Sequence, residues 1–404
     1  MNTMIGMTQI TQYMFEKATR KQLTLAQAVE QLRENANVRT VSDILSVYTG
    51  ISNKQDNKLL QSCLVDALMS TAPDAKRESV MRKVRMWLKD DCLTISKLGA
   101  IQLGFGLGLT VDRTDDMLKQ ICGEGFHWRD PEEIVFIYGL QHGLSYAETY
   151  ELYDRASAQG LLKPSELPEP ITHTDTVRKQ IIKLGGKEEL MQYLATARKK
   201  LGKLHNTAYN LFRSFLDILV APDLNDQLDD IKKYPIRNIL TTYLYQKFIP
   251  RNQKGTKKAT ETDKFVMSAL QRNIHQNWPD ETTLSKMINR EIDVTRKVLI
   301  LLFLATDGGE TDYADDFFDE MTPDESFRDM YMRLNGMLTD CGFAKIDPRV
   351  PFDWMVLYCM CADESIFIDG RVQRFLSEIF PTAVSDDELF DCGESGTHPL
   401  HFDT

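Results

Sequence analysis

The fold of this chain is decided by residues 117–140, MLKQICGEGFHWRDPEEIVFIYGL, and by a related stretch at residues 337–360, MLTDCGFAKIDPRVPFDWMVLYCM. Both contain Met-Leu, then Cys-Gly, then Arg-x-Pro, and then an apolar run with a tyrosine seven residues after the proline. Proline is favoured at the first turn of a helix, so Pro131 and Pro351 are expected to open matching helices. The shared pattern predicts an internal duplication of a helical unit.

The similarity extends upstream of these stretches. In each copy a hydroxyl residue (Ser96 or Thr295) precedes a base (Lys97 or Arg296) and then a fully apolar run. A basic segment comes before each one, at residues 80–89 and 283–290. The second copy is 21 residues longer between its hydroxyl residue and its Arg-x-Pro, and these extra residues coincide with an acidic stretch. That stretch is interpreted as an insertion between two helices.

Helix signals dominate the rest of the chain, which predicts an all-α fold. The apolar residues from Leu190 to Leu219 keep a three/four spacing, which indicates one long amphipathic helix or two helices broken near His205. Four pairs have the spacing of a capping box, in which a hydroxyl residue and an acid or amide three positions later cap a helix: Thr24 with Gln27, Ser145 with Glu148, Thr322 with Glu325, and Ser385 with Glu388.

Two segments have the composition of linkers. Residues 163–170 contain three prolines, and residues 250–262 are polar and basic without an apolar face. The predicted organisation is an N-terminal helical domain with a helix-turn-helix-like unit, a middle segment with a long helix, a C-terminal domain with the second copy, and an acidic tail. These parts cover residues 1–162, 163–250, 263–384 and 385–404.

Composition narrows the possible functions. The net charge of −11 over 404 residues argues against wrapping nucleic acid wholesale, because phosphate binding needs a positive surface. Charge is uneven, however: residues 307–325 hold nine acids and no base, and residues 178–203 hold eight bases against two acids. The seven scattered cysteines lack a CxxC pair and are expected to be buried and reduced. Without a signal peptide or an apolar run of membrane-spanning length, the chain is expected to be cytoplasmic.

Residues 84–118, VRMWLKDDCLTISKLGAIQLGFGLGLTVDRTDDML, resemble the later helices of the Xre, or lambda-repressor-like, helix-turn-helix family. The resemblance implies that Ser96 caps one helix and that residues 112–118 form the next. The following RDPEEIVFIYGLQHGLSYAETYELY is similar to an extension in uncharacterised bacterial proteins of this type. The resemblance places four candidate nucleic-acid-binding residues on or beside the recognition helix: Arg82, Lys83, Arg85 and Lys89. The first helix of the motif would come from residues 59–69.

Other patterns are assigned structural roles. The glycines between residues 99 and 108 match neither a dinucleotide-binding fingerprint nor a Walker loop, and are expected to allow close helix packing. His127 and His142 flank Glu132 and Glu133, but no nucleophile accompanies them. The sequence thus predicts no catalytic residues, no metal site and no cofactor.

The resulting hypothesis is a non-catalytic cytosolic regulatory or adaptor protein that binds DNA through the basic helix at residues 80–89. The alternative is a protein-interaction scaffold that uses the acidic stretch 307–325 and the basic segment 178–203. A helical enzyme is the third and least favoured class. DNA and a protein are the candidate partners, no membrane is expected, and the oligomeric state is not determined by the sequence.

Overall fold

The computed structural model describes residues 24–33, 38–90, 92–163, 174–220, 235–249, 268–306, 323–361 and 368–380. Within these ranges the regular structure consists of 18 α-helices and one short 3-10 helix, which confirms the predicted all-α class. The β pairing found there is an isolated antiparallel bridge between Glu124 and Phe343. Among the same residues, no helix has the length and apolarity that crossing a bilayer would require.

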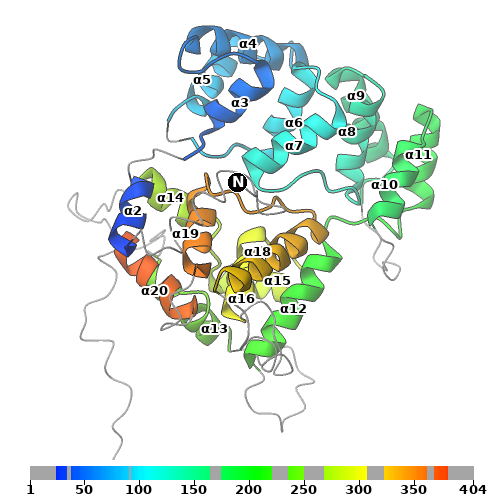
Figure 1. The fold of residues 1–404 in the computed structure, drawn as a ribbon. Coiled ribbons are helices and arrows are strands. Elements are labelled where there is room, and N and C mark those ends of the chain that lie inside the picture. Colours follow the sequence, from blue (N-terminus) through cyan, green and yellow to red (C-terminus); the bar gives the residue numbers. More distant parts are fainter. Residues whose placement is uncertain are drawn as a thin grey trace, which may run out of the picture.

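The described helices form two hydrophobic cores, and we call the two groups of helices the N lobe and the C lobe (Figure 1). The N lobe contains α3 (Val41–Thr49), α4 (Asn57–Thr71), α5 (Arg77–Trp87), α6 (Lys97–Gly106), α7 (Val111–Cys122), α8 (Pro131–Gln141), α9 (Tyr146–Ala158), α10 (Thr174–Ile182) and α11 (Lys187–Thr196). The C lobe contains α2 (Leu25–Arg33), α12 (Asn206–Val220), α13 (Ile236–Thr242), η2 (Gln246–Phe248), α14 (Ala269–His275), α15 (Glu281–Ile288), α16 (Arg296–Ala305), α18 (Pro323–Asp340), α19 (Pro351–Met360) and α20 (Ile368–Ile379).

Helix α2 belongs to the C lobe although it precedes every helix of the N lobe in the sequence. Its buried residues Ala28 and Val29 join the C-lobe core, and the Trp354 indole donates to the Ala28 carbonyl at 3.4 Å. Figure 1 shows α2 beside α20. The cores therefore group the chain by packing: α10 and α11 join the N lobe and α12 joins the C lobe. The four-part domain division made from linker composition stays a prediction.

The predicted long helix is broken, so that part of the prediction is wrong and its alternative, a break near His205, is correct. Helix α11 ends at Thr196 and α12 begins at Asn206, and the two helices belong to different cores. The segment between them is fixed by Arg129, whose guanidinium donates to the Lys200 carbonyl at 2.8 and 3.0 Å. The Gly202 amide donates in turn to the Arg129 carbonyl at 2.9 Å. These long-range bonds satisfy backbone groups that a continuous helix would use internally.

Several helix ends lie where the sequence predicts them. The capping boxes of Thr24 with Gln27 and of Ser145 with Glu148 are present. Pro131 and Pro351 are the first residues of α8 and α19. The other two predicted boxes include residues 322, 385 and 388, which lie outside the described residues.

The glycine run serves helix packing, as predicted. At Gly106 an added Cβ would lie 2.1 Å from the Ala67 carbonyl oxygen, so α6 can approach α4 this closely only with glycine at that position. Gly108, two residues later, has a φ of +63°, which is the left-handed conformation that ends the helix.

The two predicted copies make equivalent contacts. Lys97, at the start of α6, pairs with Glu133 at 2.7 Å, and Arg296, at the start of α16, pairs with Asp353 at 2.7 Å. Each acid is the third residue of its proline-opened helix, and each also accepts the amide of the residue four before that proline. Ser96 and Thr295 cap the two helices in the same way. The internal duplication remains a hypothesis, and these contacts support it.

Candidate nucleic-acid interface

Helices α4 and α5 pack against each other and present α5 at the surface of the N lobe (Figure 1). Helix α5 forms because Val80, Val84 and Trp87 recur at three- and four-residue steps, and all three are buried. Residues 72–76 separate the two helices. Residues 59–69, expected from the resemblance to form the first helix of the motif, lie within α4, and the assignment of α4 to that motif stays a prediction.

The predicted nucleic-acid-binding residues lie on the surface that α5 turns away from the core. Arg82, Arg85 and the exposed Met86 fall on one side of the helix, opposite the buried positions, since residues three and four apart share a face. Lys89 is also exposed and lies two residues after the helix ends. Lys83 is also exposed, but lies further round the helix. A helix of 11 residues is about 16 Å long, and a DNA major groove about 12 Å wide admits one.

The charges on this face are not neutralised within the described part of the chain. Arg82, Arg85 and Lys89 form no salt bridge there, and the guanidinium of Arg85 donates instead to the Met81 sulfur at 3.2 Å. Lys83 lies with its amine 4.9 Å from the centre of the Trp87 ring, and burial lowers the pKa of this lysine. Residues 76–89 hold six bases against one acid, so the α5 surface is locally positive in a chain of net negative charge.

In the other basic segments, some of the cations already contact groups within the protein and are less available to bind DNA. In the segment 178–203, Arg178 pairs with Asp112 at 3.4 Å and Lys203 pairs with Glu132, so two of the eight bases are used inside the N lobe. In the second copy, Arg290 follows α15 and lies over the Tyr209 ring at 4.4 Å. The acidic residues 307–322 lie outside the described residues.

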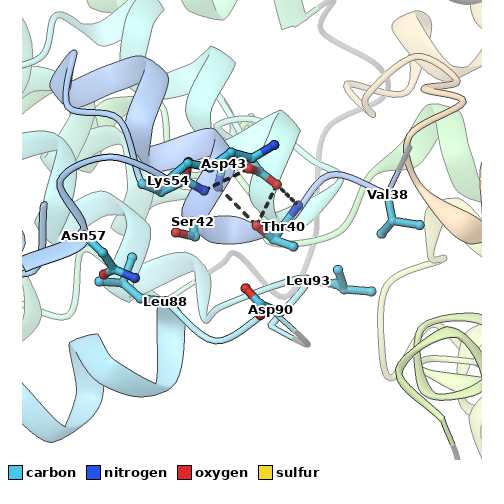
Figure 2. A pocket seen from close by; sticks show the side chains of 10 residues that line it. Val38, Thr40, Ser42, Asp43, Lys54, Asn57, Leu88, Asp90 and Leu93 are labelled. Carbon is cyan, nitrogen blue, oxygen red and sulfur yellow. Dashed lines mark hydrogen bonds between the residues drawn. The ribbon is translucent and has the colours of Figure 1, made fainter. Parts of the chain in front are cut away.

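A polar pocket of about 380 Å³ opens at the C-terminal end of α5, lined in part by Leu88 and Asp90 (Figure 2). One of its lining acids, Asp43, forms hydrogen bonds within the protein. The Asp43 carboxylate accepts from the Thr40 amide at 2.9 Å and from the Asn53 side chain at 2.9 Å. Burial raises the pKa of Asp43, but these hydrogen bonds outweigh burial, and the pKa lies below its usual value. The pocket is a polar depression beside α5, and its described lining residues include no buried charged group without a hydrogen-bond partner.

A larger cleft of about 550 Å³ lies between the lobes, lined by the end of α7, the start of α16 and residues 344–350. Its buried lysine is bound within the protein. The Lys297 amine donates to the carbonyls of Asn273, Ile274 and Gln276 at the C-terminal end of α14, and burial lowers the pKa of this lysine to about 7. Burial raises the pKa of the Cys122 thiol to about 12, which keeps it protonated and poorly nucleophilic.

The arginines of the shared Arg-x-Pro differ in what they bind. Arg349 pairs with Asp347 of its own preceding loop, but Arg129 binds the Lys200 carbonyl 71 residues away. The sequence analysis did not predict the half-buried pairs of Lys97 with Glu133 and of Arg296 with Asp353, although the matching positions of Lys97 and Arg296 in the two copies could have indicated them.

Comparison with protein-family models, curated proteins and solved structures gave no match to this chain.

Proposed function

We propose that this protein binds double-stranded DNA through the exposed face of α5 and acts as a regulatory protein without catalysis. The observation that carries this proposal is a set of exposed cations on and just after α5, Arg82, Arg85 and Lys89, which form no salt bridge among the described residues. Acids three or four residues from the bases would stabilise a solvent-exposed basic helix by forming ion pairs. This face has a single acid, Glu78, so most of its bases lack such a neighbour.

The geometry predicts a weak, strongly salt-dependent interaction. The affinity of a protein for B-DNA falls with salt at a slope of about −0.9 for each phosphate that it neutralises. If Arg82, Lys83, Arg85 and Lys89 contact one phosphate each, the slope is about −3.6 and the affinity falls roughly 100-fold between 50 and 200 mM salt. The net charge of −11 disfavours DNA binding on the rest of the molecule, so binding should depend on the cations of the α5 surface.

Fluorescence anisotropy with a labelled mixed-sequence 20-base-pair duplex, measured between 50 and 200 mM salt, tests this proposal. The triple substitution Arg82→Ala, Arg85→Ala and Lys89→Ala removes three of the four contacts, so the slope should fall to about −0.9. Lys83 is kept because its contact with Trp87 contributes to packing.

A matched control removes the same charge from another exposed surface of the N lobe. Lys179, Lys183 and Lys187 on and beside α10 and α11 are exposed, and they belong to the basic segment of the scaffold alternative. Their replacement by alanine should leave most of the binding and its slope intact. Absence of binding at 50 mM salt, or equal loss in both triple variants, would refute the α5 proposal.

A further inference from the structure

Two histidines stack face to face at the junction of the lobes. The rings of His127 and His205 have centroids 3.8 Å apart and an interplanar angle of 19°. His127 precedes α8 in the N lobe, and His205 ends the segment that leads into α12 of the C lobe. Asp293, just before α16, fixes His205: its carboxylate accepts from the His205 amide at 3.0 Å and lies 2.5 Å from the ring Nδ1.

The groups that surround His127 disfavour a positive charge on its ring. His127 is 6% exposed, and Lys97, Arg129 and His205 all act on it from the elements packed around it. The acids nearby are already bound: Glu133 and Glu124 pair with Lys97, and Asp293 pairs with His205. Burial, followed by the charges of His205, Lys97 and Arg129, lowers the pKa of His127 well below its ordinary value.

We propose that this histidine stack is an acid-sensitive latch, and that protonation of His127 separates the N lobe from the C lobe. An imidazolium at this position would lie against His205 and close to Lys97 and Arg129, and the described acids beside it, Glu133 and Asp293, already pair with Lys97 and His205. Separating the lobes exposes His127 to water, where the charge is solvated.

Among the described residues, other polar contacts also cross the junction, including the Arg39 guanidinium, which lies 4.0 Å from the Asp347 carboxylate. The Ala344 amide donates to the Gly123 carbonyl at 2.9 Å beside the bridge between Glu124 and Phe343, and the Arg39 amide donates to the Arg349 carbonyl at 3.0 Å. The Phe343 ring also packs on His205, with centroids 5.6 Å apart. The stack is thus one of several contacts that join the lobes.

The direction of the pH effect follows from the lowered pKa. In the open form His127 titrates near its ordinary value of about 6.5, and in the closed form it resists protonation. Protons are therefore taken up on opening, and the ratio of open to closed molecules rises as pH falls below about 6.5. The rise is at most about tenfold for each pH unit, and it ends at the lower pKa of the closed form.

Small-angle X-ray scattering between pH 7.5 and 5.0, with circular dichroism as a check on helix content, measures the opening directly. The wild-type chain should show a radius of gyration that rises below pH 6.5 while its helix content is unchanged. His127→Phe keeps a ring for the stack but cannot be protonated, so it should stay closed at pH 5.0. His127→Gln, which is smaller and also neutral throughout, provides a second test if the phenylalanine variant does not fold.

His142→Gln is the matched control, because His142 is an exposed histidine of the same lobe and lies away from the junction. It should reproduce the wild-type opening curve. A wild-type radius of gyration that does not change between pH 7.5 and 5.0 would overturn the latch. So would opening of both His127 variants at the same pH as the wild type.

Discussion

Replacing Asp353 by asparagine should destabilise the C lobe severely. Asp353 is 1% exposed, and its carboxylate accepts from the Arg296 guanidinium at 2.8 and 2.7 Å and from the Asp347 amide at 2.8 Å. Asparagine has the same shape, but it has one acceptor oxygen and turns an NH2 group toward donors. At least one of these bonds is lost, and the half-buried Arg296 is left beside a neutral partner.

The expected cost is about 3–5 kcal/mol, the range found when one member of a buried ion pair is removed. The lost hydrogen bonds alone agree with this size, since a bond to a charged group contributes about 1.5–3 kcal/mol. Arg296 still donates to the carbonyls of Ala344 and Lys345, so its guanidinium retains two hydrogen-bond partners. The cost should therefore stay within this range.

Urea unfolding followed by tryptophan fluorescence can measure the loss in the C lobe alone. The background variant Trp87→Phe with Trp128→Phe leaves Trp278 and Trp354, both in the C-lobe core, as the reporters. A matched control is Asp329→Asn, which breaks the exposed pair of Asp329 with Arg333 on α18 and should cost about 0.5 kcal/mol or less.

A double variant tests whether the loss of stability comes from leaving one charge of the pair without its partner. Arg296→Met with Asp353→Leu replaces both charges by apolar groups, and such replacements are often neutral or stabilising. We expect the double variant to recover most of the stability that Asp353→Asn loses. The reasoning fails if Asp353→Asn costs less than about 1 kcal/mol, or if the double variant is as unstable as the single one.

Three further predictions concern packing, capping and thiols. Gly106→Ala forces a methyl group against the Ala67 carbonyl and should cost the N lobe about 1–3 kcal/mol in urea unfolding, whereas an unchanged midpoint would show that α4 and α6 are not packed this closely. Ser96→Ala removes the N-cap of α6 and should cost about 1 kcal/mol by the same measurement, and restoration by Thr, as at the second copy, is the control. Burial raises the pKa of three thiols, those of Cys122, Cys341 and Cys359, to about 12, so about one in ten thousand is ionised at pH 8. Mass spectrometry after iodoacetamide treatment should find these cysteines unmodified in the folded protein and modified in urea.

Local sequence was sufficient for the helices and for several of their ends. Pro131 and Pro351 open helices because the first turn needs no N–H from them, and Ser145 with Glu148 closes a capping box three residues apart. The exposed side of α5 could also be placed, because Val80 and Val84 fix which side is buried. In these cases the interacting groups lie within one turn of each other.

Tertiary structure decided the features that depend on residues far apart in the chain. The apolar periodicity from residue 190 to 219 fits one long helix, but the helix stops because Arg129 and the Gly202 region bond to each other. Helix α2 has no local signal for the C-lobe core that it enters, and the stack of His127 on His205 joins residues 78 apart. Sequence by itself determined the all-α class and several helix ends, such as those at Pro131 and Pro351, because α-helical hydrogen bonds join residues four apart. The break between α11 and α12, the assignment of helices to lobes and the stack of the two histidines required the folded chain, since packing and ion pairing depend on distance in space. So did the finding that the cations on and after α5 form no salt bridge among the described residues.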